Sequence, residues 1–189
     1  MGKEQPAEYY DSIYKTSKEY NQHYTKSRYY NLWKRVIKNL DPNKEVLEFG
    51  CGTGQLAKML HDNKFVCYFG IDFSEEAIRI AEAMNEKPFT FAVGDILQNS
   101  LPNALLGETP QIICCETLEH IEKDKEFIQR LRETYPGARI VFTVPTFNDA
   151  AHVRHFKDLF EGYFYYKPLF SKVITYEKFG GWLLFECEL

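Results

Sequence analysis

The sequence lacks the marks of a secreted or membrane-bound protein. No apolar run approaches the roughly 18 residues that a membrane-spanning helix needs. The opening residues, MGKEQPAEYYD, do not read as a signal peptide, and Pro6 argues against N-myristoylation. Five cysteines form neither a C-x-x-C pair nor a zinc-binding spacing. We therefore expect reduced thiols in a cytoplasmic protein that does not bind membranes. Internal repeats and low-complexity tracts are also missing, so no repeat architecture is expected.

The composition is ordinary, but the charge is unevenly distributed. With 189 residues, 44% of them hydrophobic and 26% charged, we expect one globular domain over residues 1–189. Its predicted parts are a helical arm (1–41) and a core (42–189). Residues 1–40 hold eight Lys and Arg against four Asp and Glu, and seven of the thirteen tyrosines. Such an arm can contact an anionic substrate or nucleic acid, or can simply pack its aromatic side chains on the core.

The order of predicted elements indicates an α/β protein. Helices are predicted at 6–14 and 18–39, and Asp41-Pro42 ends the second. Strands and helices then alternate, which predicts a parallel sheet with helices on both faces. Ser74 is a plausible cap for the helix that follows it. The predicted strands are 45–49, 65–71, 89–93, 111–116 and 138–144, and the helices between them are 55–62, 74–84 and 123–134.

The end of the chain departs from this alternation. A short helix is predicted around residues 155–161, followed by strands at 171–177 and 182–189. Gly180-Gly181 lies between the two strands, and a tight glycine turn predicts antiparallel pairing. We therefore expect an antiparallel hairpin to close the parallel sheet.

The segments VLEFGCGTG and GIDFS carry the strongest functional signal. The first is a buried-strand pattern that ends in Glu48 and a turn with Gly50, Gly52 and Gly54. The second places Asp72 at the end of the next strand, which completes the pattern of a nucleotide pocket. A dinucleotide motif would have its third glycine at the sixth position, where this chain has Gln55. Glu48 would repel a pyrophosphate but would suit a ligand that carries positive charge.

This pattern resembles motif I of class I S-adenosylmethionine (AdoMet) dependent methyltransferases, and the resemblance covers residues 44–145. It implies a Rossmann-like doubly wound sheet with strand order 3-2-1-4-5-7-6, an antiparallel last strand, and AdoMet as cofactor. Further AdoMet-binding candidates follow each strand. The implied roles place Glu48, Gly50, Cys51, Gly52 and Gly54 at the methionine end, Asp72 on the ribose hydroxyls, Phe73, Asp95 and Ile96 around the adenine, and Cys115 and Glu116 beside the sulfonium.

Two of these acids also have simpler interpretations. Asp72 can cap the next helix, and Asp95 can be a turn residue. In the arm, the spacing places Tyr24, Arg28 and Tyr29 near one face. An arm of this kind folds over AdoMet in the family, so we expect one arm tyrosine to touch the cofactor.

The methyl acceptor is only partly constrained by the sequence. Methyl transfer depends mainly on alignment, and a base is needed only for a nucleophile such as an alcohol. The Cys-Glu-Thr-Leu segment after the fourth strand argues against enzymes that methylate nucleic-acid bases. We expect a small-molecule acceptor, a metabolite or a saccharide or lipid intermediate, methylated at oxygen, with Glu116, His120 and His155 near the methyl group. His152-Val153-Arg154-His155-Phe156 resembles a string of small-molecule members, where Arg154 would face an anionic group.

Other interpretations remain open. Glu116, Glu119 and His120, joined by His152 or His155, resemble the metal site of small-RNA 3′-terminal 2′-O-methyltransferases. The long loop of that family is absent, so the main interpretation assigns no metal and considers nucleic acid an unlikely partner. A non-catalytic AdoMet-binding partner protein is a second alternative, and histidines on a surface lid would have no catalytic role. We expect a monomer or a homodimer.

Overall fold

The structure is a computed structural model that describes residues 2–98, 100–104 and 106–189. Two compact units make up the chain: Pro6–Glu108, and Met1–Gln5 together with Thr109–Leu189. The strands are β1 (Val46–Phe49), β2 (Tyr68–Asp72), β3 (Thr90–Val93), β4 (Gln111–Cys115), β5 (Arg139–Pro145), β6 (Lys172–Phe179) and β7 (Trp182–Glu188).

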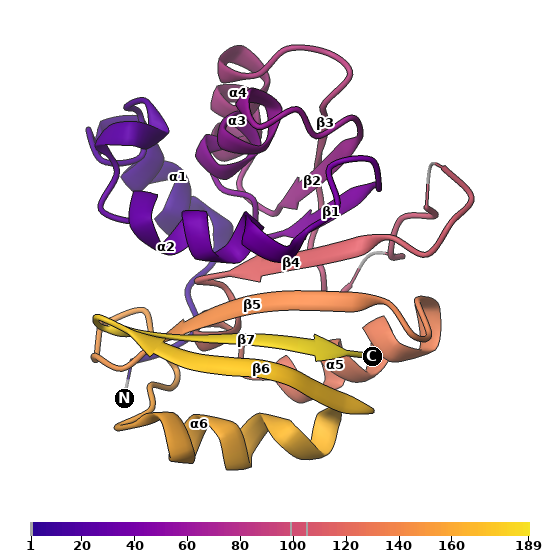
Figure 1. The fold of residues 1–189 in the computed structure, drawn as a ribbon. Helices are drawn as coiled ribbons and strands as arrows, with labels where there is room; N and C mark the ends of the chain where they lie inside the picture. The colour runs from indigo at the N-terminus through magenta and orange to yellow at the C-terminus, as the bar shows by residue number, and fades with distance from the viewer. Residues whose placement is uncertain (1, 99, 105) are drawn as a thin grey trace. The chain divides into compact units, whose positions relative to one another are not determined.

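These strands form one sheet in the order β3-β2-β1-β4-β5-β7-β6 (Figure 1). β1 pairs with β2, β2 with β3, and β4 with β5 in parallel. β7 runs antiparallel to both β5 and β6. The α/β class, the strand order and the antiparallel last strand are therefore confirmed.

The helices of the first unit pack around short strands, of which β1 is fully buried and β3 is only partly buried. All four residues of β1 are buried, and one face of α3 (Gln55–Asp62) is buried through Leu56, Met59 and Leu60. α4 (Glu75–Met84) begins where expected, since the hydroxyl of Ser74 accepts a hydrogen bond from the N–H of Ala77 at 3.0 Å. The cap predicted from the sequence is confirmed.

The arm contains more turns than the sequence predicts. The unit holds α1 (Ala7–Thr16), η1 (Tyr24–Lys26), α2 (Tyr30–Val36) and η2 (Ile37–Asn39), so a continuous helix over 18–39 is wrong. The side-chain amide of Asn21 donates to the carbonyls of Tyr14 and Ser17, at 2.6 and 2.8 Å. The carboxylate of Glu19 accepts from the N–H of Arg28 at 2.9 Å. Such local side-chain bonds compete with the helical backbone pattern.

In the second unit an aromatic core lies between strands and helices. The rings of Phe142 and Phe185 stack at 5.0 Å, and Tyr166 meets Phe142 at 4.9 Å. Gly180 and Gly181 form the predicted hairpin turn between β6 and β7, which is confirmed. The other elements of the unit are η3 (Leu118–His120), α5 (Asp124–Thr134), α6 (Leu159–Tyr166) and η4 (Lys167–Leu169).

The helix predicted around residues 155–161 lies further along the chain, so that prediction is wrong in position. Asp158 caps α6 by accepting from the N–H of Glu161 at 2.9 Å, which sets the helix start at Leu159. The residues before it are held as a loop, partly because the N–H of Val153 donates to the carbonyl of Glu119 at 2.8 Å. Across the described ranges, no helix combines the length and apolarity needed to cross a lipid bilayer.

Candidate active site

Asp72, the last residue of β2, joins the glycine turn to the start of α4. Its Oδ2 accepts from the N–H of Gly52 at 2.9 Å, and its Oδ1 accepts from the N–H of Ser74 at 3.0 Å. Gly52 has φ of +51°, a left-handed conformation that glycine adopts without steric cost. The side chain of Asp72 therefore connects the backbone of the glycine motif to Ser74, the residue that caps α4. Because the cap is Ser74, the interpretation of Asp72 as the helix cap is wrong.

Burial makes Asp72 a weaker acid than usual. Only 6% of the residue is exposed, and this burial raises its pKa to about 6. The N–H groups of Ser74 and Gly52 lower the pKa, while the charge of Asp11 raises it. The group is thus mostly ionised at neutral pH and sits among polar hydrogens at the carboxyl end of a parallel strand. A charge-assisted acceptor in this place can bind a pair of ribose hydroxyls.

Glu48 in β1 is held by an internal partner. The hydroxyl of Tyr68 donates to its Oε2 at 2.5 Å, and both side chains are buried. Burial raises the pKa of Glu48 to about 8, the Tyr68 hydrogen bond lowers it, and the charge of Asp72 raises it. A Cβ on Gly70 would lie 2.7 Å from the Tyr68 hydroxyl and 2.9 Å from Cys51 Sγ. The lack of a side chain at Gly70 therefore makes room for this cluster.

The arm is attached to the glycine motif by two of the motif's own side chains. Thr53 Oγ1 donates to the carbonyl of Tyr20 at 2.5 Å. Gln55, in the position where a dinucleotide motif has glycine, donates from Nε2 to the carbonyls of Glu19 and Gln22 at 3.0 and 2.6 Å. These bonds hold residues 19–22 against the turn, a role that local sequence patterns did not reveal.

Two tyrosines of α1 lie close to the predicted cofactor residues. A Cβ on Gly52 would lie 3.6 Å from the Tyr14 hydroxyl, and the ring of Tyr10 lies 5.3 Å from that of Phe73. Burial raises the pKa of Tyr14 well above its ordinary value, and the charge of Asp72 raises it further. Tyr24, one of the arm residues singled out from the sequence, instead donates to Asp62 at 3.0 Å. The amphipathic pattern of residues 7–16 carried no sign of this placement.

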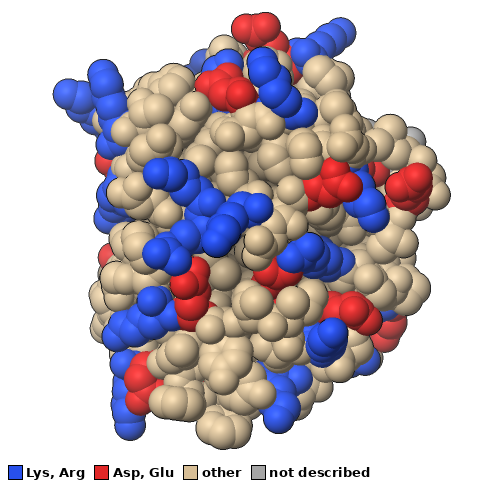
Figure 2. All heavy atoms as spheres, viewed as in Figure 1, with Lys and Arg blue, Asp and Glu red and all other residues tan. Residues whose placement is uncertain are grey.

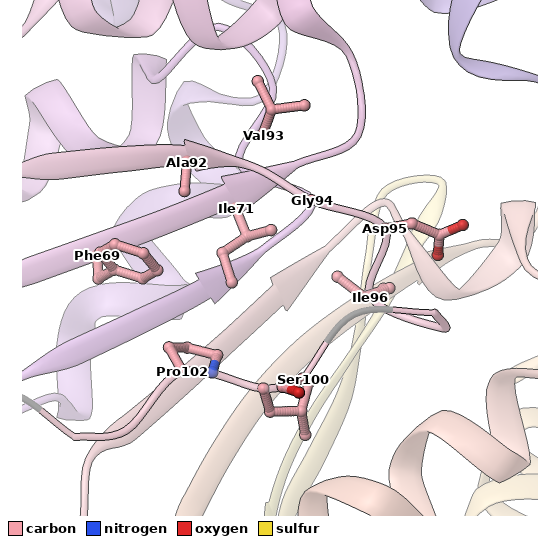
Figure 3. Close-up of a pocket in the computed structure, with 10 residues that line it drawn as sticks. Phe69, Ile71, Ala92, Val93, Gly94, Asp95, Ile96, Ser100 and Pro102 are labelled. Carbon is pink, nitrogen blue, oxygen red and sulfur yellow. The ribbon is translucent and has the colours of Figure 1, made fainter.

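Asp95 stabilises the turn that follows β3. Its carboxylate accepts from the N–H of Leu97 at 2.8 Å and from the side-chain amide of Gln98 at 2.7 Å. In Figure 3 this carboxylate is turned away from a nearby cavity of about 210 Å³. The cavity is lined by Phe69, Ile71, Ala92, Val93, Gly94, Asp95, Ile96, Ser100, Leu101 and Pro102.

The cavity is distinct from the surroundings of the Asp72 carboxylate. Phe69 and Ile71 line it, and side chains alternate along a strand, so they face away from Gly70 and Asp72. Figure 3 shows these residues and Ala92 on one side and the loop residues Ser100 and Pro102 on the other. Ile96 borders the cavity, as an adenine contact would require, but Asp95 does not point into it.

The second unit contains the remaining predicted residues. Cys115 is buried at the end of β4, and Glu116 follows with φ of +52°. The hydroxyl of Thr143 donates to Glu116 Oε1 at 2.9 Å, and the indole N–H of Trp182 donates to Oε2 at 2.7 Å. A left-handed non-glycine residue costs about 1–3 kcal/mol and is typical of functional sites. Neither partner was evident from sequence, because both are distant along the chain.

Glu119, His120 and His152 converge in the same unit. Their ligand atoms all lie within 4.8 Å of one another, and Glu119 Oε1 is 3.8 Å from His120 Nε2. Glu119 is fully buried, which raises its pKa well above the ordinary value, and the charge of Glu116 adds to this. Burial lowers the pKa of His120 to about 4. Within the part of the chain that the structure describes, this group includes neither Glu116 nor His155.

Arg154, next to His155, does not have the role that the sequence predicts. Arg154, expected to face an anionic ligand, donates instead to the carbonyls of Leu118 and Ile121, at 2.7 and 2.5 Å. Its guanidinium also forms an ion pair with the carboxylate of Asp124 at 3.1 Å, so Arg154 binds groups of the protein itself and not an external anion. His155 is partly exposed, and its Nδ1 has no hydrogen-bond partner among the described residues.

Comparisons with known proteins agree with this fold and motif. A sheet in this order, parallel except for β7, with an acid at the end of the strand after the glycine turn, is the Rossmann-like fold of methyltransferases. A family model described as "Methyltransferase domain" matches residues 21–175, and the chain belongs to this family. The resemblance to class I methyltransferases is confirmed.

The similar proteins span a range of organisms. An uncharacterized methyltransferase of Bacillus cytotoxicus is 33% identical over 108 residues, which cover 55% of this chain and 48% of the relative. The chain thus spans about half the length of such curated relatives. A chain from a complex of the Haloferax volcanii Trm112 methyltransferase activator with a methyltransferase has a TM-score of 0.77 at 14% identity, covering 95% and 96% of the two chains. A DhpI–SAM–HEP complex gives 0.72 at 17% identity, covering 95% and 94%.

Proposed function

We propose that the protein is an enzyme that transfers the methyl group of AdoMet. The buried carboxylate of Asp72, placed between the glycine turn and the start of α4, is the observation that carries this proposal. Family membership supports methyl transfer, and the SAM in the DhpI complex supports AdoMet as the cofactor. Asp72 would accept from the ribose, Phe73 and Ile96 would lie beside the adenine, and the turn over residues 50–54 would take the methionine end.

Glu48 and Asp95 could make their predicted contacts with AdoMet only if their present hydrogen bonds changed. Glu48 would have to share the Tyr68 hydroxyl or act through water on the ammonium. Asp95 would have to turn from its own loop to reach the adenine amino group. Tyr14 is the arm tyrosine that we expect to touch AdoMet, because its hydroxyl lies over Gly52.

The acceptor that we propose is a small metabolite, or a saccharide or lipid intermediate, methylated at oxygen. Glu116 is held by Thr143 and Trp182, which supports a fixed contact for an acceptor hydroxyl. His120, with a pKa of about 4, is too weak a base to accept that proton efficiently near neutral pH. His155 is the better candidate for the base. Orientation would supply most of the acceleration, with about 7–11 kcal/mol attainable.

Calorimetric titration tests the cofactor assignment. AdoMet and its demethylated product should bind with micromolar dissociation constants, and Asp72→Ala should weaken binding more than about tenfold, the loss of one charge-assisted pair. Asp41→Asn is the matched control, since Asp41 precedes β1 and so lies at its opposite end from the glycine turn. Absence of binding at millimolar ligand would rule the proposal out. An unchanged affinity in Asp72→Ala would show that the pocket lies elsewhere.

An RNA 2′-O-methyltransferase is the second candidate, favoured by the charge of α2 and η2. Lys34, Arg35 and Lys38 are exposed there. Figure 2 shows basic side chains gathered over the region that Figure 1 labels α2. Transfer of a labelled methyl group to short single-stranded or duplex RNA would favour this candidate, and transfer to neither would dismiss it. A purely binding protein would take up AdoMet without turning it over.

The remaining expectations concern assembly and location. All five cysteines are free in the structure, in keeping with the reduced thiols that the sequence predicts. The cytoplasmic location, the absence of membrane binding and the monomeric or dimeric state stay predictions, as does the single domain over residues 1–189 with its arm at 1–41.

A further inference from the structure

A buried carboxylate without a hydrogen-bond partner is the starting observation. Glu119 is 0% exposed, and neither of its carboxylate oxygens has a hydrogen-bond partner among the described residues. Buried polar groups are almost always satisfied, and a buried acid is paired or binds a metal. His120 Nε2, at 3.8 Å from Glu119 Oε1, is beyond hydrogen-bonding distance. The space between the Glu119 carboxylate and the His120 ring could therefore hold an additional atom that binds both side chains.

The two histidines near Glu119 have their tautomers set by backbone carbonyls. His120 Nδ1 lies 3.0 Å from the carbonyl oxygen of Ala151, and His152 Nδ1 lies 3.2 Å from that of Phe147. A carbonyl can only accept, so each neutral ring carries its proton on Nδ1 and its lone pair on Nε2. Metal-binding histidines are oriented in the same way, by donating their other ring nitrogen to a carbonyl or carboxylate.

Several contacts hold the loop of His152 against the turn of Glu119. The carbonyl of Glu119 accepts from the N–H of Val153 at 2.8 Å, and Arg154 donates to the carbonyls on both sides, of Leu118 and Ile121. The N–H of Gly2 donates to the carbonyl of His152 at 2.9 Å. The three side chains are therefore placed by the fold before any ligand arrives.

We propose that Glu119, His120 and His152 form a binding site for a divalent transition metal of the zinc type. Two imidazoles and one carboxylate are a donor set that zinc and its neighbours in the first transition row favour. Ligand atoms about 2.0–2.2 Å from one tetrahedral ion lie roughly 3.3–3.6 Å apart. The three ligand atoms, now within 4.8 Å of one another, would have to move closer together by about 1 Å when the metal binds. Glu116 is engaged by Thr143 and Trp182, which leaves three protein ligands and at least one open position.

An open coordination position would let the metal bind the acceptor hydroxyl in the proposed reaction. A hydroxyl oxygen bound there would have its pKa lowered, as bound water does on zinc. The released proton would pass to His155, the base of the proposed function, the oxygen would form a bond to the methyl carbon, and the carbon–sulfur electron pair would remain on sulfur. This consequence rests on the proposed function, whereas the metal site does not.

Metal titration of the chelator-treated whole protein tests the site without AdoMet. Zn²⁺ and Co²⁺ should bind one to one, and Glu119→Gln and His152→Ala should each weaken binding at least about 100-fold. His155→Ala is the matched control, since it removes a histidine three positions away that is outside the group, and it should leave the affinity within about twofold. Failure of wild-type protein to bind Zn²⁺ at micromolar concentration would overturn the proposal. Equal loss in His155→Ala and His152→Ala would overturn the ligand assignment.

Spectroscopy on the wild-type protein tests the metal site even if one of the variants does not fold. Bound Co²⁺ should show the strong visible absorption of four- or five-coordinate cobalt, whereas six-coordinate surface binding gives only weak bands. Long-range ¹H–¹⁵N spectra should show Zn²⁺ on Nε2 of two histidines, with Nδ1 still protonated. Weak bands, or coordination through Nδ1, would exclude this site. A protein that binds AdoMet but no metal would keep the proposed function and lose this inference.

Discussion

At the scale of single residues, Glu48 controls a pH dependence of stability. Its pKa is about 8 in the folded protein against 4.5 ordinarily, because it is buried. Folding therefore takes up a proton between pH 4.5 and 8, and the free energy of unfolding falls as the pH rises through this window. Glu48→Gln keeps an acceptor for Tyr68 and removes the titration. We expect the variant to match wild type near pH 4 and to exceed it at pH 8, by at most about 5 kcal/mol.

Urea unfolding across this pH range measures the effect. Glu82→Gln, which changes an exposed glutamate of α4, should keep the wild-type pH profile. Parallel profiles for Glu48→Gln and wild type would contradict the assignment of this titration to Glu48.

Gly54 tests the shape of the glycine turn. It has φ of +74°, and an added Cβ would meet Asn85 Nδ2 at 2.6 Å and Ala81 Cβ at 2.9 Å. Gly54→Ala should lower the free energy of unfolding by roughly 2–5 kcal/mol, combining backbone strain with overpacking. Gly137 has φ of +76° with open space around it, so Gly137→Ala isolates the strain at about 1–2 kcal/mol. If urea denaturation gave the same loss in free energy of unfolding for Gly54→Ala and Gly137→Ala, Gly54 would not be sterically confined.

At the scale of elements, the side chain of Asp11 attaches α1 to the start of α4. Asp11 Oδ1 accepts from the hydroxyl of Ser74 at 2.5 Å and from the N–H of Glu76 at 3.2 Å. Its negative charge at the N-terminus of α4 also suits the helix dipole. Asp11→Ala should cost about 1 kcal/mol of stability and speed amide exchange in α1.

Hydrogen exchange by mass spectrometry measures the release of α1, and urea unfolding measures the stability of the whole protein. Together they distinguish the loss of this attachment from a general loss of stability. Glu8→Ala removes another, exposed acid of the same helix, and it should leave exchange in α1 close to wild type. Unchanged exchange in Asp11→Ala would mean that α1 is held by its aromatic contacts alone.

Elements with strong periodicity were predictable, and segments held by distant partners were not. α3, α4 and the buried strands follow from apolar spacing and the Ser74 cap. The turns at residues 17–29 depend on Glu19 meeting Arg28, a contact that no local pattern encodes. Likewise, the residues before α6 form a loop that is bonded to the distant Glu119, while the cap by Asp158 sets the helix start at Leu159.

At the scale of the whole molecule, the prediction concerns cooperativity. The seven strands belong to one sheet, so we expect a single two-state transition. Trp33 lies in the first unit and Trp182 in the second, which provides a reporter for each. In Trp182→Phe and in Trp33→Phe, the fluorescence midpoint in urea should coincide with the circular-dichroism midpoint of the same variant. Separate midpoints would show that the units unfold independently.

The sequence by itself determined the class of fold and the AdoMet motif. Both depend on short-range patterns, namely alternating apolar segments, glycines at a turn and acids at strand ends. Only the tertiary structure decided which partners those acids have. Glu48 meets Tyr68, Glu116 meets Trp182, and Glu119 meets His120 and His152 because folding brings residues from separate segments together. Such contacts depend on three-dimensional proximity and burial, which spacing along one chain does not specify.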